Sequence, residues 1–268
     1  MKKRIISIIL VAALVIGTVI PASAYSDKQL NAADALYNIG LFLGYGESYG
    51  LDNTLTRYEG YSLMIRMLGD DEAAKNCKES HPFKDIAAKD AWALPYVKYS
   101  YATGLTKGVS ATQFGGTSAM TAQQFCAICL RALGYEDVGG KDFSYDNAIA
   151  FAREKGILNG ISSTATFKRG DCVIMFWNTL NALLKGSDKT LAATLIEKGV
   201  FTQAAFDNAA RIQKNGISAG DGSGEKNAVR ISEGDPRIDS DPADSDKPQK
   251  PVTDDSIFGD DFDLPPMV

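Results

Sequence analysis

The sequence predicts an all-α fold built from three tandem copies of one helical unit, followed by a polar tail. The first observation is a fifteen-residue stretch with a helix-start signal and a helical apolar face, which occurs three times, at residues 55–69, 120–134 and 167–181. The second is a glycine-bounded turn before each copy, at residues 40–44, 104–108 and 156–160. Such repeats cannot bury their apolar faces alone, so they indicate units that stack or bundle.

Residues 1–24 are expected to form a secretory signal peptide. Basic residues 2–4 precede an apolar run, and Ala22-Ser23-Ala24 forms a small-residue cleavage site. Retention of this run as a membrane anchor is the alternative, but the run is short for a span. No cysteine follows the predicted cut after Ala24, which argues against a lipoprotein. We therefore expect a secreted protein with no membrane contact after cleavage.

The first repeat is expected over residues 25–70. Apolar residues at helical spacing predict a helix over residues 31–43, before the long helix. Thr56 and Glu59 form a capping-box pattern at the start of the long helix, and Gly69 provides its stop. A short helical extension is expected over residues 71–77.

The second repeat is expected over residues 79–140 and the third over residues 141–185. His81-Pro82 breaks the chain ahead of the second, in which Asp90 is a plausible N-cap for a helix over residues 91–103. The first helix of the third is expected over residues 145–155.

Residues 186–213 do not match the repeat. Two short helices are predicted there, over residues 190–199 and 204–212, as a cap on the bundle. From residue 214 to the end, 13 acidic residues stand against 6 basic ones among Gly, Ser and Pro. Such a segment buries too little apolar surface to offset its ordering entropy, so residues 214–268 are expected to be a disordered acidic tail.

Composition and motifs exclude several function classes. The formal net charge is -5, which excludes a basic protein that coats nucleic acid. The only histidine is His81, and neither a nucleophile elbow nor a phosphate loop occurs. The spacing of the tail's aspartates does not fit an EF-hand. We therefore expect no catalysis, no cofactor and no metal site.

The four cysteines allow two readings. Cys126 and Cys129 form a CxxC, a pattern typical of metal and redox sites. Both belong to the apolar stripe of the second long helix, which favours two small core residues. Cys77 could pair with Cys126 or Cys172 in a secreted chain, and the sequence does not decide this.

Arg57 and Arg169 are the strongest binding candidates among the residues. Each follows the cap of a long helix, so its guanidinium lies beside free backbone N–H groups and the positive end of the helix dipole. A planar fork of donors there suits a carboxylate or phosphate group of an anionic ligand. The alternative is structural: each arginine ties down a loop or pairs with an aspartate.

Several short motifs occur in one order. The second repeat carries Phe83-Lys-Asp85, Trp92-Ala93, the turn at 104–108 and Met120-Thr121, and the first has Leu55-Thr-Arg-Tyr-Glu59. The third keeps Phe143, its glycine turn and Phe167-Lys-Arg-Gly-Asp171. Over residues 30–185 this set resembles the S-layer homology (SLH) repeat. In that family three repeats form a pseudo-threefold spindle around a central three-helix bundle.

The resemblance implies a non-catalytic protein anchored noncovalently to the bacterial cell wall. Grooves between SLH repeats bind an anionic secondary cell-wall polymer, often through a pyruvylated sugar. Transferred to matching positions, the polymer-binding residues are Arg57, Arg169, Lys168, Asp85, Trp92, Gly44, Gly108 and Gly160. Replacing Arg57 and Arg169 together by alanine is then expected to weaken wall retention.

Departures from the family pattern keep a second function open. Ala122 stands where the family has arginine, the first repeat lacks the F-x-D and W-A motifs, and the third lacks the tryptophan. The alternative is therefore a secreted protein–protein interaction or scaffold module with grooves that no longer bind polymer. A protein partner for the acidic tail also remains open.

Overall fold

The computed structural model describes residues 25–44 and 48–217, and within these residues it is helical, with isolated bridges but no sheet. The all-α prediction is confirmed. The expected signal peptide and nearly all of the expected acidic tail lie outside the described residues.

The described residues form nine α-helices, joined by turns and three 3-10 turns. The helices are α1 (Asp27–Asn38), α2 (Arg57–Met67), α3 (Asp71–Lys75), α4 (Leu94–Ala102), α5 (Ala122–Ala132), α6 (Ala148–Glu154), α7 (Arg169–Asn181), α8 (Leu191–Glu197) and α9 (Gln203–Asn215). The 3-10 turns are Ala88–Ala93, Val138–Gly140 and Tyr145–Asn147.

The three repeated stretches form α2, α5 and α7, and each begins with the same cap geometry. The Thr56 N–H donates to Glu59 Oε2 at 2.6 Å, and the Thr121 N–H donates to Gln124 Oε1 at 3.2 Å. The Lys168 N–H donates to a carboxylate oxygen of Asp171 at 3.0 Å. The third residue of each helix therefore satisfies the free cap N–H. At Thr56 and Thr121 the cap hydroxyl in turn accepts the N–H of that third residue, at 3.3 and 3.2 Å.

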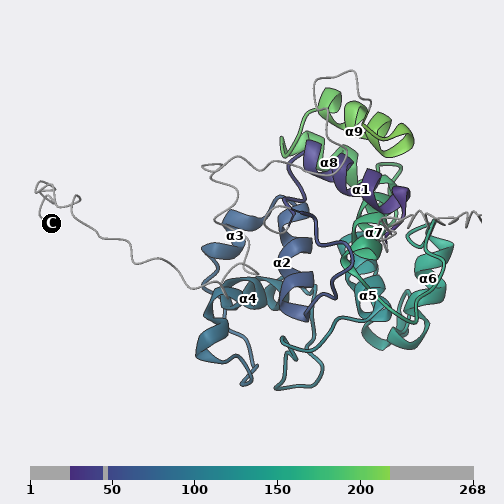
Figure 1. Cartoon of the computed structure of the whole chain (residues 1–268). Helices are drawn as coiled ribbons and strands as arrows, with labels where there is room; N and C mark the ends of the chain where they lie inside the picture. The colour runs from purple at the N-terminus through teal and green to yellow at the C-terminus, as the bar shows by residue number, and fades with distance from the viewer. Residues whose placement is uncertain (1–24, 45–47, 218–268) are drawn as a thin grey trace, which may run out of the picture.

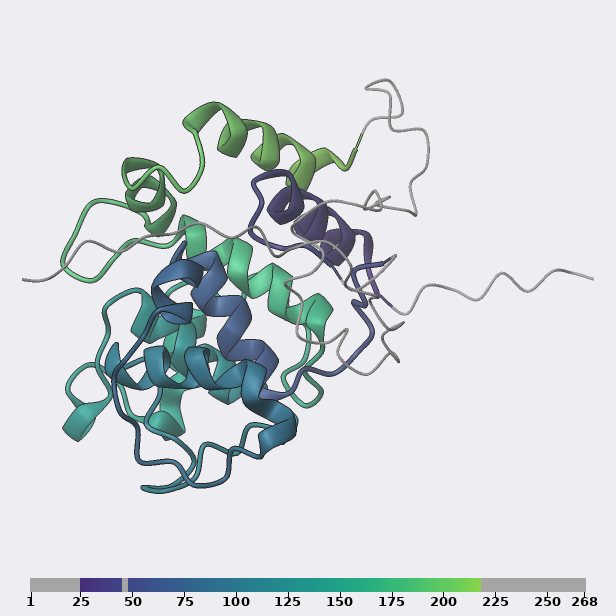
Figure 2. The same ribbon diagram turned by 90° about the vertical axis from the view of Figure 1, so that its left-hand side faces the viewer.

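The long helices lie together at the centre of the molecule, with the shorter helices around them (Figures 1 and 2). α5 packs against both α2 and α7. Each long helix is also covered by a shorter one: α4 lies on α2, α6 lies on α5, and α1 lies on α7. The first helix of the folded chain thus closes the arrangement onto the last long helix.

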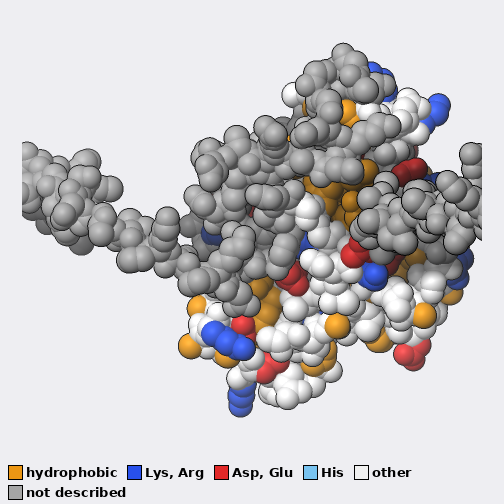
Figure 3. Space-filling model, viewed as in Figure 1, with side chains coloured by type: hydrophobic (Ala, Val, Ile, Leu, Met, Phe, Trp, Pro, Cys, Tyr) orange, Lys and Arg blue, Asp and Glu red, His pale blue; other side chains and the backbone are white. Residues whose placement is uncertain are grey.

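The core is centred on these three helices. Met64, Cys129 and Phe176, one from each long helix, have no exposed surface. On the face drawn in Figure 3, acidic and basic side chains are interspersed over the described surface.

Two details of the first helices differ from the prediction. α1 begins at Asp27 behind a Ser26 cap, and it ends at Asn38 because Gly40 turns the chain with a φ of 76°. The helix therefore begins four residues before, and ends five residues before, the expected range of residues 31–43. Asp90 is not an N-cap either: it lies inside a 3-10 turn, and α4 begins at Leu94 with Pro95 in its first turn, where the missing N–H costs nothing.

The two helices outside the repeat pack at one end of the bundle. α9 lies along α1, as Figures 1 and 2 both show, although about 180 residues separate them in sequence. Phe206 of α9 also stacks on Trp177 of α7, with ring centroids 5.4 Å apart. α9 thus forms a wall over the junction between α1 and α7.

Candidate functional site

Arg57 is buried at the start of α2, where it holds the loop that precedes α5. Arg57 is only 3% exposed, and its Nε–H donates to the Phe114 carbonyl at 2.9 Å. The Arg57 and Tyr58 backbone N–H groups donate to the carbonyls of Ser118 and Gly116, both at 3.0 Å. Backbone and guanidinium together fasten one repeat to the loop of the next.

Arg169 makes equivalent contacts at the start of α7. We call each of these two sets of contacts, around Arg57 and around Arg169, an arginine latch. Arg169 is 1% exposed, and its Nε–H donates to the Tyr49 carbonyl at 3.2 Å. The Arg169 and Gly170 N–H groups donate to the carbonyls of Asn53 and Leu51, both at 2.9 Å. Each carbonyl that accepts in the Arg57 latch lies 65 positions after its counterpart in the Arg169 latch. The two loops therefore present their carbonyls to the two helices in the same way.

Ala122 occupies the corresponding position at the start of α5. It is 2% exposed and offers no guanidinium. Nearby, Phe125 of α5 contacts Phe167, with ring centroids 5.1 Å apart. At this third junction an aromatic contact is present in place of an arginine latch.

Asp85 and Trp92 lie in the same region as Arg57. Asp85 accepts from the Phe114 N–H at 2.8 Å and the Gly115 N–H at 2.7 Å. Burial raises the pKa of Asp85, but these two backbone donors outweigh it and the pKa lies below its usual value. Trp92 is half-buried and meets the Tyr58 ring edge-on at 5.8 Å. Two of the predicted residues, Arg57 and Asp85, therefore position the backbone of one loop, and Trp92 packs on the neighbouring Tyr58.

The remaining predicted residues are dispersed. Lys168 lies 3.5 Å from Asp52, a pair in which both side chains are 40% exposed. A Cβ at Gly108 would lie 2.4 Å from the Phe83 ring and a Cβ at Gly44 3.0 Å from a backbone oxygen, so both glycines are packed against the protein itself. Gly160 differs because its nearest neighbour is Ile174 at 3.8 Å, beside an open pocket.

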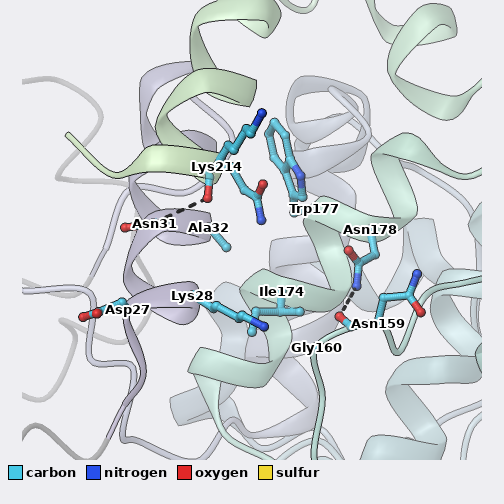
Figure 4. A pocket seen from close by; sticks show the side chains of 11 residues that line it. Asp27, Lys28, Asn31, Ala32, Asn159, Gly160, Ile174, Trp177, Asn178 and Lys214 are labelled. Carbon is cyan, nitrogen blue, oxygen red and sulfur yellow. Dashed lines mark hydrogen bonds between the residues drawn. The ribbon is translucent and has the colours of Figure 1, made fainter. Parts of the chain in front are cut away.

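An open pocket lies beside Gly160, between residues of the first and third repeats. It has a volume of about 370 Å³ and lies between α1, the turn at 159–160, α7 and the end of α9 (Figure 4). The residues that line it are Asp27, Lys28, Asn31, Ala32, Asn159, Gly160, Ile174, Trp177, Asn178, Gln213 and Lys214.

The pocket combines an apolar wall with amides and two lysines. Trp177 and Ile174 provide the apolar surface, and the Asn178 Nδ2–H group donates to the Ile157 and Asn159 carbonyls at 2.9 and 2.8 Å. Neither Lys28 nor Lys214 forms an ion pair with another described residue. In Figure 4 Lys28 extends across the pocket toward Ile174, while Asp27 points away from it.

Two partly buried acid–base clusters lie at the ends of α2 and α5, and the sequence did not single them out. Arg131 donates to Asp137 through Nε at 3.3 Å and through an Nη at 2.6 Å. These donors and Lys107 lower the pKa of Asp137 to about 2, although burial alone would raise it. In the other cluster, Arg66 Nε lies 3.2 Å from Asp71 Oδ1. The sequence signal for these clusters is an aspartate that follows the last arginine of the long helix by five residues in one case and six in the other.

The cysteines are free thiols. Cys126, Cys129 and Cys172 are fully buried in the core, and burial raises the pKa of each thiol. Cys77 is half-buried in the segment after α3. Within the described residues, no group of three His, Cys, Asp or Glu residues could hold a metal ion. No helix among them is long and apolar enough to cross a membrane.

Residues 82–126 match the S-layer homology domain. A "Cell surface protein" of Thermoanaerobacter kivui is 31% identical over 183 residues, which cover 66% of this chain and 23% of that protein. A "Middle cell wall protein" of Brevibacillus brevis (strain 47 / JCM 6285 / NBRC 100599) is 30% identical over 156 residues, or 58% of this chain and 14% of that protein.

A third relative bears the name of an enzyme. It is an "Endoglucanase" of Bacillus sp. (strain KSM-635), 34% identical over 99 residues, or 33% of this chain and 10% of the enzyme. The chain thus spans less than a quarter of the length of each of these relatives.

Proposed function

We propose that this chain, whose residues 82–126 match the S-layer homology domain, is a non-catalytic S-layer homology protein of the bacterial cell surface, attached noncovalently to an acidic polymer of the cell wall. The names of its relatives place those proteins at the cell surface or in the cell wall. The relative with a catalytic name shares only a tenth of its own length with this chain, which favours attachment and not catalysis as the shared role.

The observation that carries this proposal is the pocket between α1, α7 and α9. Its volume of about 370 Å³ is in the range of small-ligand sites. The apolar surface of Trp177 and Ile174 suits the C–H face of a sugar ring, and the Asn159 amide and the Asn178 side-chain oxygen suit its hydroxyl groups. Lys28 and Lys214 supply the positive charge for a carboxylate.

The other predicted residues act at a distance from this pocket in the proposal. Arg57 and Arg169 hold the loops that keep the three repeats in register, and Asp85 and Trp92 support the loop at Phe114. Gly160 leaves the pocket floor open, since a side chain there would extend beside Ile174. Lys168 lies at the start of α7, the helix whose later residues line the pocket.

The test is sedimentation of the full chain with purified Gram-positive cell walls. We expect retention on walls that keep a pyruvylated polymer, and its loss after that polymer is extracted. Lys28→Gln with Lys214→Gln removes both cations from the pocket and is expected to weaken retention by about tenfold or more, since a hydrogen bond to a charged group contributes about 1.5–3 kcal/mol.

The matched control is Lys89→Gln with Lys198→Gln. Both lysines are exposed, and neither forms an ion pair with a described residue. This variant has the same net charge as the pocket variant and is expected to bind like the unmodified chain. Equal weakening of both variants would show a nonspecific charge effect. Undiminished retention on extracted walls would favour the alternative, a protein–protein interaction module.

A further inference from the structure

The three long helices carry equivalent positions that receive different residues. Counting from the shared start, the tenth residue is Arg66 in α2, Arg131 in α5 and Asn178 in α7. The geometry supports this equivalence: Arg131 Nη1 donates to the Leu105 carbonyl at 2.9 Å, and Asn178 Nδ2 donates to the Ile157 carbonyl, also at 2.9 Å. Both carbonyls belong to the second residue of the glycine-bounded turn.

At the α5 position, a carboxylate of the chain itself pairs with the arginine. Asp137, from the segment after α5, accepts from Arg131 and lies 2.6 Å from Lys107 Nζ. Its side chain is only 8% exposed, while that of Lys107 is 46% exposed. Lys107 is the fourth residue of the glycine-bounded turn. Two cations from the turn and the long helix therefore converge on one buried acid group.

At the α2 position, the same arrangement appears with other donors. Asp71 follows α2 and lies 3.2 Å from Arg66 and 2.8 Å from Lys75. The Tyr96 hydroxyl donates to Asp71 at 2.8 Å. Here too, a carboxylate from the segment after the long helix pairs with the arginine at the tenth helical position.

The α7 position lacks this internal carboxylate. The residue in register with Asp71 is Leu183, which is 53% exposed. Asn178 and Asn159 take the places of Arg131 and Lys107, and the positive charges come instead from Lys28 of α1 and Lys214 of α9. This groove is the open pocket of Figure 4.

We propose that Asp137 and Asp71 are built-in substitutes for the acid group of the ligand, so that two grooves are filled from within and the chain binds one acidic sugar, in the α1–α7–α9 pocket. This inference rests on the proposed wall-binding function. The Asp137 cluster shows how the fold accommodates a carboxylate between a long helix and its turn. Their ion pairs also keep two positions closed, since an external carboxylate would have to displace one already held by two or three donors.

The experiment is calorimetric titration of the full chain with a soluble monosaccharide glycoside that carries a pyruvate ketal. The same glycoside without pyruvate is the control ligand. A monovalent probe reports the number of sites directly. We expect one site per chain for the unmodified protein, loss of at least about tenfold in affinity for Lys28→Gln with Lys214→Gln, and no change for Lys89→Gln with Lys198→Gln.

Asp137→Ala tests the substitute itself. The variant empties the groove but keeps Arg131 and Lys107, so it is expected to gain a second site, which remains when Lys28→Gln and Lys214→Gln are added. Acetate, a small carboxylate, is expected to raise the melting temperature of Asp137→Ala by more than that of the unmodified chain.

The outcomes separate this inference from the proposed function. Two or three sites in the unmodified chain would overturn the inference and leave wall binding intact. A folded Asp137→Ala variant with one site and no stabilisation by acetate beyond that of the unmodified chain would overturn the role of Asp137. If the pyruvylated glycoside binds neither protein and walls do not retain the chain, the proposed function itself fails.

Discussion

Arg57 and Arg169 show how a residue with the chemistry of a binding group serves as a structural one. Both are almost fully buried, and both use Nε to hold a carbonyl of a neighbouring loop. Each guanidinium also lies over an aromatic ring, Arg57 at 5.2 Å from the Phe114 centroid and Arg169 at 5.3 Å from that of Phe42. Of the two interpretations open at the sequence level, this geometry favours the structural one.

Arg169→Ala is expected to lower the free energy of unfolding by about 3 kcal/mol, because it removes a charge-assisted hydrogen bond and the packing of a long side chain. Urea unfolding measures this loss. The affinity of the folded fraction for cell walls is expected to stay unchanged. A large loss of affinity with unchanged stability would instead make Arg169 a ligand-contact residue.

Asp137 makes stability depend on acid. Its pKa of about 2 in the folded chain lies below the ordinary value of 3.8, so the folded state binds the proton more weakly than the unfolded state. The stabilisation is therefore present above about pH 4 and lost as the pH falls toward 2. We expect the melting temperatures of the unmodified chain and Asp137→Asn to converge over this range. A constant difference from pH 5 to pH 2 would contradict this.

For single residues, the sequence predicted positions that depend on local spacing. It did not predict contacts between residues that the fold brings together from distant parts of the chain. The position of Arg57 beside a cap follows from Thr56 and Glu59 alone. The contact of Arg131 with Asp137 requires the chain to turn back after α5, and Lys107 reaches the same carboxylate from 30 residues upstream. No periodicity marks such a convergence.

Among the elements, the long helices were predictable because each carries its own start signal and apolar face. The start of α1 differs from the prediction because the Ser26–Gln29 capping box lies upstream of the apolar pattern on which the prediction rests. The extent of α9 over α1 and α7 could not be derived either. An amphipathic pattern identifies a face that packs, but it does not identify the partner.

The buried face of α5 predicts the reactivity of the thiols. Cys126, Cys129 and Cys172 have no exposed surface, and burial keeps their thiols protonated. With Ellman's reagent we expect one fast-reacting thiol per folded chain, Cys77, and all four after unfolding in urea. Rapid reaction of two or more thiols in the native chain would contradict the packing of α5 against α7.

α9 is expected to shield Trp177. Phe206→Ala removes the ring stacked on Trp177 and is expected to shift its fluorescence to longer wavelength, since the indole gains contact with water. A Trp92→Phe background leaves Trp177 as the only tryptophan, because the sequence has two. Phe201→Ala, whose ring contacts Phe206 at 5.6 Å, is a comparison expected to give a smaller shift. An unchanged spectrum for Phe206→Ala would show that α9 does not cover this side chain.

In the molecule as a whole, the three similar units differ at the tenth position of their long helices. Two of these positions hold a carboxylate of the chain, and the third borders an open pocket. The latches at Arg57 and Arg169 hold two junctions with one geometry, and α1 packs on α7 to close the arrangement. The grooves diverge because the segments after the long helices differ: two return a carboxylate, and the third leads into α8 and α9. Helical repeats and their order were evident from the sequence, whereas the open groove depends on α9.

The measurement that tests the central claim most directly is the fluorescence of Trp177 in the Trp92→Phe chain, titrated with the pyruvylated glycoside and with its pyruvate-free counterpart. The account predicts a saturable change with the first, which Lys28→Gln with Lys214→Gln weakens by at least about tenfold, and no change with the second at the same concentrations. Equal responses to both sugars, or no response to either, would contradict an acid-binding pocket between α1, α7 and α9.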